Sequence, residues 1–107
     1  MDADYELKRG DTSPPLQTTL TVNGSPQNLS NADTVTVTMK PLGGGEAVSG
    51  TAQVVSASDG VVAYHWNDGD TDSVGLYFAE WVVTYGNGRE QSFPNDEFDL
   101  LYIKDDL

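Results

Sequence analysis

The run Asp68-Gly69-Asp70-Thr71-Asp72 is the segment whose residue types and spacing come closest to a chemical site. Alternating carboxylates on a tightly turning backbone suit Ca²⁺, because this ion takes about six to eight oxygen ligands. The match to an EF-hand loop ends there: Ser73 stands where that loop needs Gly, and Ala79 where it needs Glu. The three aspartates of the run are therefore weak metal-ligand candidates, and an acidic turn is the alternative interpretation.

The rest of the sequence offers little for catalysis. His65 is the single histidine, cysteine is absent, and no nucleophile motif such as Gly-x-Ser-x-Gly is present. The glycines punctuate turns and do not form a phosphate-binding loop before a helix. With seventeen acidic residues, some carboxylate pair will be close by chance, so such a pair does not indicate a hydrolase. We predict a protein that is not an enzyme and uses no cofactor.

The length of 107 residues predicts one domain, 1–107, because two cores would each bury too little apolar surface to offset conformational entropy. The absence of cysteine excludes disulfides. The acidic start, Met1-Asp2-Ala3-Asp4, is unlike a signal peptide, and no apolar run approaches the roughly 20 residues of a membrane-spanning helix. We therefore expect no membrane partner.

Seventeen acidic and five basic residues give a formal net charge of -12. This charge disfavours binding to nucleic acid and to anionic membranes. The acids are dispersed over turns and strand ends, which is typical of a solvated coat. One hypothesis is a halophilic host, since molar salt shortens the Debye length to about 3 Å and screens self-repulsion. An ordinary acidic domain is the alternative.

Apolar and polar residues alternate through much of the chain, as in strands with one buried face. In residues 34–40, Val35, Val37 and Met39 share one face. In residues 75–85, the face opposite Glu80 is the more apolar, and we expect it to be the core because an unpaired carboxylate is costly to bury. Strands are predicted at 5–8, 16–22, 34–40, 47–55, 61–66, 76–85, 89–93 and 100–104.

These short strands, separated by turn-forming Gly, Asn and Asp residues, predict an all-β fold, an immunoglobulin-like antiparallel β-sandwich of about seven or eight strands. Pro41 and the glycines after it predict a flexible hairpin loop at one end of the sandwich. We expect partner contacts at strand edges or at two loops, 42–47 and 68–73. The candidate contact residues are Leu42, Gly43, Gly44, Gly45, Asp68, Asp70 and Asp72.

Taken in order, several segments make the whole chain resemble the N-terminal immunoglobulin-like domain of the phage baseplate upper protein family. The resemblance implies a virion component of a tailed virus, without enzymatic activity, that attaches a longer receptor-binding or fibre-bearing chain to a symmetric baseplate core. The segments are Lys8-Arg9-Gly10-Asp11-Thr12 with Pro14 and Pro15, Asn28-Leu29 to Val37-Thr38-Met39, Gly60-Val61-Val62-Ala63-Tyr64-His65-Trp66, Gly69-Asp70-Thr71 leading to Gly75-Leu76-Tyr77-Phe78-Ala79-Glu80-Trp81, Phe93-Pro94 and Ile103.

The resulting expectation is a structural and assembly protein located in the virion, present in several copies and bound to other virion structural proteins. Because this chain ends at Leu107, without the longer arm of that family, capsid decoration or cementing is an alternative to a baseplate or tail role. A carbohydrate- or host-surface-binding module is a further alternative, since sandwich domains with exposed aromatic side chains hold sugars. Burial of Trp66 and Trp81 would weaken that alternative.

Overall fold

The computed structural model describes residues 5–94 and 99–105, and within them all regular structure is β-strand. No helix in this part of the chain is therefore available to cross a membrane. The strands are β1 (Tyr5–Lys8), β2 (Leu16–Thr19), β3 (Thr21–Val22), β4 (Ser25–Pro26), β5 (Ala32–Pro41), β6 (Val48–Ser56), β7 (Val61–Tyr64), β8 (Gly75–Tyr85), β9 (Glu90–Phe93) and β10 (Asp99–Lys104).

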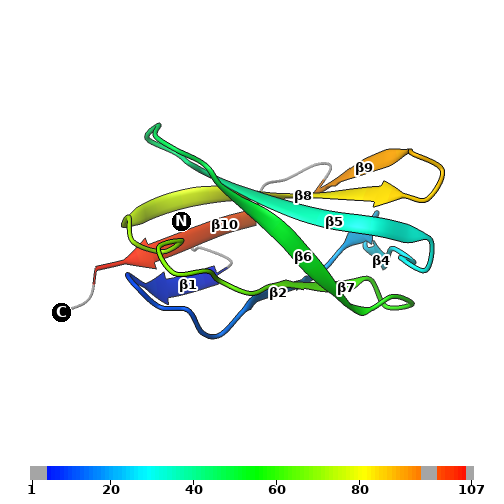
Figure 1. Cartoon of the computed structure of the whole chain (residues 1–107), viewed down its shortest axis with the longest axis horizontal. Coiled ribbons are helices and arrows are strands. Elements are labelled where there is room, and N and C mark those ends of the chain that lie inside the picture. Colours follow the sequence, from blue (N-terminus) through cyan, green and yellow to red (C-terminus); the bar gives the residue numbers. More distant parts are fainter. Residues whose placement is uncertain (1–4, 95–98, 106–107) are drawn as a thin grey trace.

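The strands form a sandwich of two layers (Figure 1), which confirms the predicted all-β sandwich class. The first layer has the order β1-β10-β8-β5-β6, with β9 also paired to β8. The second layer is β6-β7-β2. Strand β6 belongs to both layers, because its first half pairs with β5 and its second half, from Gln53 onward, pairs with β7. A separate two-stranded ribbon, β3-β4, turns at Asn23 and Gly24, which both have positive φ.

One pairing departs from the expected antiparallel pattern. Strand β1 runs parallel to β10, with Tyr5 opposite Leu101 and Lys8 opposite Lys104. The chain leaves β1 for β2 in the other layer, and β10 pairs antiparallel with β8 on one side and parallel with β1 on the other. The first and last strands of the described chain therefore lie side by side.

Two strand predictions need correction. The expected strand 16–22 is interrupted at Leu20, whose N–H donates to the Gly60 carbonyl and whose carbonyl accepts from Gln27 N–H, so the segment divides into β2 and β3. The expected strand 61–66 ends at Tyr64. Trp66, beyond that end, is held by a 2.9 Å hydrogen bond from its Nε1 to the Pro14 carbonyl.

The core lies between the layers and follows the predicted faces. Val35, Val37 and Met39 of β5 are at most 2% exposed, which confirms the alternation of that segment. Tyr77, Ala79, Trp81 and Val83 of β8 are also buried, while Glu80 is exposed. The second layer contributes Leu16, Val62 and Tyr64 to the same apolar cluster.

Candidate functional site

The acidic loop between β7 and β8 is held in a fixed shape by its own side chains. Asp70 Oδ2 accepts hydrogen bonds from the Tyr64 hydroxyl at 2.6 Å and from Asn67 N–H at 2.8 Å. At the far end of the loop, the Tyr77 hydroxyl donates to the Ser73 carbonyl at 2.7 Å. Two core tyrosines thus fix the loop at both ends, and Asp68 and Asp72 stand exposed between these anchors.

Thr71 joins this loop to the turn that follows β1. Its side chain is 1% exposed, and its hydroxyl donates to the Asp11 carbonyl at 2.8 Å. Gly10 N–H donates in return to the Thr71 carbonyl at 3.1 Å, and Gly10 has a φ of +87°, which favours glycine. Two of the segments on which the family resemblance rests, 8–12 and 69–71, therefore form one hydrogen-bonded unit.

The β5–β6 hairpin ends in the loop 42–47, which stands clear of the body of the sandwich (Figure 1). Its base is fixed by a 2.9 Å hydrogen bond from Leu42 N–H to the Leu76 carbonyl. Gly44 and Gly45 carry positive φ at the tip, so the backbone there turns as glycine allows. Leu42 itself is 44% exposed.

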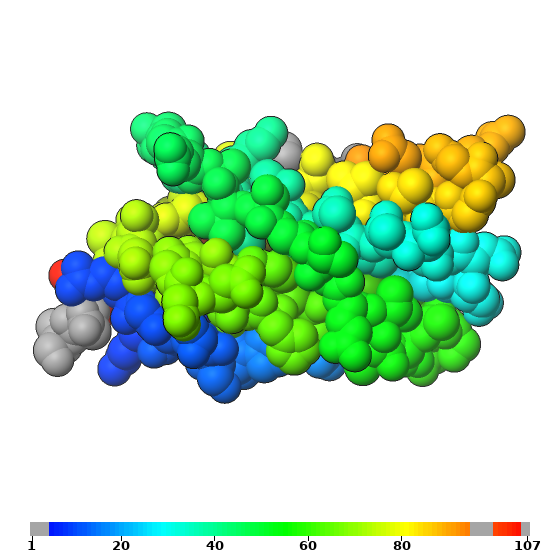
Figure 2. All heavy atoms as spheres, viewed as in Figure 1, coloured from blue at the N-terminus to red at the C-terminus, as the bar shows by residue number. Residues whose placement is uncertain are grey.

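The two loops predicted separately as contact regions line one cleft of about 400 Å³. The hairpin contributes Gly44, Gly45, Glu46 and Ala47, and the acidic loop contributes Gly69, Asp70 and Ser73. Figure 2 shows the hairpin tip, in green, standing above the yellow-green surface of residues around 70. Of the candidate contact residues, Gly44, Gly45 and Asp70 line this cleft, and Leu42, Gly43, Asp68 and Asp72 lie outside its lining.

The cleft has acidic and apolar walls. Glu46 and Asp70 supply carboxylates, and Val74, Tyr77 and Pro41 supply apolar surface. Burial raises the pKa of Tyr64 from 10.0 to about 12, and the hydrogen bond to Asp70 and the charge of that carboxylate act in the same direction. Such a cleft admits neutral or cationic groups and repels anions.

The weak metal candidates do not assemble into a metal site. Within residues 5–94 and 99–105, no group of three His, Asp or Glu side chains is placed to hold an ion. Asp70 Oδ2 already accepts hydrogen bonds from the Tyr64 hydroxyl and from Asn67 N–H, so this aspartate stabilises the turn. His65 is exposed, and its Nε2 lies 3.2 Å from Gln53 Oε1 on the neighbouring strand.

Both tryptophans are buried, with Trp66 7% and Trp81 0% exposed. Trp66 also stands edge-on to Tyr64, with ring centroids 5.5 Å apart. Neither indole offers an open face on which a sugar ring could stack. This burial weighs against the carbohydrate-binding alternative.

Sequence reasoning did not single out several residues of the site, among them Thr71, Val74 and Tyr77. Thr71 was part of the recognised acidic run, but a threonine among aspartates is an ordinary turn residue, and only the tertiary structure shows its burial. Val74 is an apolar residue next to a turn glycine, and its 49% exposure is visible only in the folded chain. Tyr77 was predicted to be in the core, and its hydroxyl reaches the loop from there.

Comparison with known proteins gives a likeness of fold. No family model matches the chain, and no curated protein matches it. Among solved structures, CopC from Methylosinus trichosporium OB3b is similar, with a TM-score of 0.51 and 11% sequence identity. The alignment covers 99% of this chain and 88% of that one. At this identity the likeness supports the β-sandwich architecture and carries no information on activity.

Proposed function

We propose that this protein is a non-enzymatic structural and assembly protein of a tailed-virus particle, which docks onto other virion proteins through the loop end of the sandwich. The observation that carries the proposal is the convergence of the two candidate loops, 42–47 and 68–73, on one cleft. The hydrogen-bonded unit of Thr71, Gly10 and Asp11 holds one side of that end rigid. A rigid, acidic and partly apolar cleft suits a protein partner, because little order has to be gained on binding.

The family resemblance supplies the biological context of the proposal. Two of its segments meet at this end of the molecule, and the sandwich architecture agrees with the expected attachment module. In that role the partner would be another virion structural protein, and several copies would sit in a symmetric assembly. Capsid decoration or cementing uses the same kind of contact and differs only in the position on the particle.

Immunogold electron microscopy of particles from the source of the sequence tests the proposal. Gold at tail tips is the expected result for the baseplate role, and gold on heads would assign the decoration role instead. Particles that stay unlabelled, and whose denatured proteins also give no band with the antibody, would rule out a virion protein.

A pair of variants tests the cleft itself. Glu46→Lys changes the charge in the cleft wall, and Asp33→Lys makes the same change at an exposed position of β5 outside the cleft. We expect Glu46→Lys to reduce incorporation into particles at least tenfold, and Asp33→Lys to leave it unchanged. Equal incorporation of both variants would exclude the cleft as the contact while leaving the virion role to the immunogold result.

A further inference from the structure

A set of apolar side chains lies on the outer face of the first layer, turned away from the core. Leu76 of β8 stands opposite Tyr102 of β10, and Phe78 stands opposite Leu100 in the next outward-facing row. Leu42 adjoins them, since its N–H donates to the Leu76 carbonyl at 2.9 Å. We call these five residues, Leu42, Leu76, Phe78, Leu100 and Tyr102, the outer-face patch.

The patch is exposed where a solvated sheet face normally carries polar residues. Leu42, Leu76 and Tyr102 are 44%, 38% and 39% exposed, and Phe78 and Leu100 are half-buried. Farther along β5 and β8, the same face carries Thr36, Glu80 and Thr84, together with the half-buried Val82. The large exposed apolar side chains of β8 and β10 are thus gathered in one half of the face, as in a surface that another protein covers.

Most basic residues of this acidic chain lie on or next to strands of the layer that carries the patch. Four of the five, Lys8, Arg9, Lys40 and Lys104, lie on β1, β5 and β10 or directly after β1. Lys40 is the register partner of Phe78, a member of the patch. The fifth, Arg89, lies just before β9.

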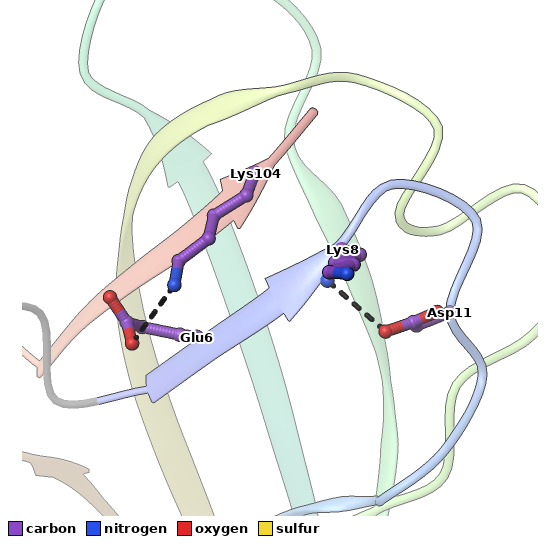
Figure 3. A network of polar contacts seen from close by, with 4 residues as sticks. All are labelled: Glu6, Lys8, Asp11 and Lys104. Carbon is purple, nitrogen blue, oxygen red and sulfur yellow. Dashed lines mark hydrogen bonds and ion pairs between the residues drawn. The ribbon is translucent and has the colours of Figure 1, made fainter. Parts of the chain in front are cut away.

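Two of these cations are already neutralised. Lys104 Nζ is 3.3 Å from Glu6 Oε2 (Figure 3), and Arg9 is 3.1 Å from Asp105 Oδ1. Lys8 and Lys40 form no ion pair within the described residues. The dashed contact of Lys8 in Figure 3 is its backbone N–H, which donates to Asp11 Oδ2 at 3.1 Å. In the part of the chain that the structure describes, the ammonium groups of Lys8 and Lys40 thus have no carboxylate partner, and Lys40 lies directly next to the apolar surface.

We propose that the outer-face patch binds a second protein whose contact surface is apolar and carries carboxylates opposite Lys8 and Lys40. Apolar burial supplies the driving force, and the lysines need acidic partners because burying an unpaired charge is costly. Leu42 belongs to loop 42–47, but none of the five patch residues lines the cleft, so the inference holds whether or not the proposed virion function does.

A second copy of this chain fits the patch less well. It would bring the same two unpaired lysines. Among the residues that the structure describes, Glu80 is the carboxylate on β8 next to the patch, while Glu6 and Asp105 are already paired. It would also bring a second net charge of -12 close to the first. The charge pattern therefore favours a different protein as the occupant.

Site-specific photocrosslinking in cells that make the protein naturally tests the inference. A benzophenone amino acid is placed at Leu76 in the patch or at Val55, which is 52% exposed on β6 and lies outside it. We expect ultraviolet light to give an adduct at least tenfold stronger from position 76 than from position 55. Mass spectrometry should identify a peptide of another protein, with apolar residues flanked by Asp or Glu, at the crosslink.

Charge reversal tests the lysine component of the same contact. Lys40→Glu should lower the adduct yield from position 76 at least tenfold, whereas Arg89→Glu, the same reversal away from the patch, should not change it. Melting curves of all variants serve as the control that folding is retained. An adduct with this chain itself, a crosslinked peptide rich in Lys or Arg, equal adducts at positions 76 and 55, or no adduct at 76 would each overturn the proposal.

Discussion

Gly50 of β6 shows how a single hydrogen atom in place of a side chain shapes the sandwich. A Cβ at this position would lie 2.5 Å from Tyr64 Cε1 and 2.9 Å from its hydroxyl oxygen. The ring has no room to move away, because Tyr64 is 1% exposed and its hydroxyl is bound to Asp70. Close packing therefore requires glycine at this point of β6.

We expect Gly50→Ala to destabilise the fold by about 1–3 kcal/mol, the usual range for overpacking a core. Gly43→Ala is the matched control, since a Cβ there meets nothing within 4 Å and the residue has no positive φ. Urea unfolding followed by tryptophan fluorescence measures both. Equal stability of the two variants would show that Tyr64 yields to the methyl group.

The Tyr64–Asp70 hydrogen bond should be visible in alkaline titration. The pKa of Tyr64 is raised to about 12, so the folded protein keeps this proton where the unfolded chain releases it near pH 10. The corresponding stability is complete below pH 10 and is lost as pH rises from about 10 to 12. Asp70→Asn should lower the pKa of Tyr64, because the negative charge beside the phenolate is removed.

NMR of the tyrosine ¹³Cζ resonances, assigned with Tyr64→Phe, measures this pKa directly. The Tyr64 signal should titrate at about pH 12 in the wild type and at lower pH in Asp70→Asn. A Tyr64 signal that titrates near pH 10 in both proteins would contradict the assigned hydrogen bond.

Among the elements, the junction between the β7–β8 loop and the turn after β1 depends on Thr71. Thr71→Val keeps the shape of the side chain but removes the donor to the Asp11 carbonyl. We expect a loss of about 1–2 kcal/mol, from the lost hydrogen bond and an acceptor left without its partner. Thr36→Val, on the exposed face of β5, is the control and should be close to neutral.

Hydrogen exchange separates a local from a global effect of Thr71→Val. The amide of Gly10, which donates to the Thr71 carbonyl, should lose protection before the amides of β5 do. Unchanged protection at Gly10 would mean that the junction is held without the hydroxyl.

The strands were largely predictable from sequence, whereas the contacts between segments that are distant in the chain were not. β5 and β8 follow from local alternation, because one buried and one exposed face require a period of two. The break at Leu20 depends on hydrogen bonds to Gly60 and Gln27, partners that only the folded chain supplies. The convergence of loops 42–47 and 68–73 is equally non-local, so each loop could be proposed as a contact region while their shared cleft could not.

For the whole molecule, the net charge of -12 should make stability depend on salt. The ion pairs Arg9–Asp105 and Lys104–Glu6 are exposed and contribute little to stability. Screening of repulsion among the acids is therefore the larger effect, and molar KCl should raise the melting temperature. Calorimetry in dilute buffer and in molar KCl measures this change, and an unchanged melting temperature would argue against a halophilic origin of the acidic coat.

The parallel pairing of β1 with β10 also determines how the sandwich resists mechanical force. Tyr5 begins one strand and Lys104 ends the other, and because the strands run in the same direction these two residues lie at opposite ends of the pair. A pull on the two chain ends would slide β1 along β10, so the hydrogen bonds between them would be strained together and not opened one after another. Tension applied through the termini is thus met by shear, the direction in which paired strands yield least readily.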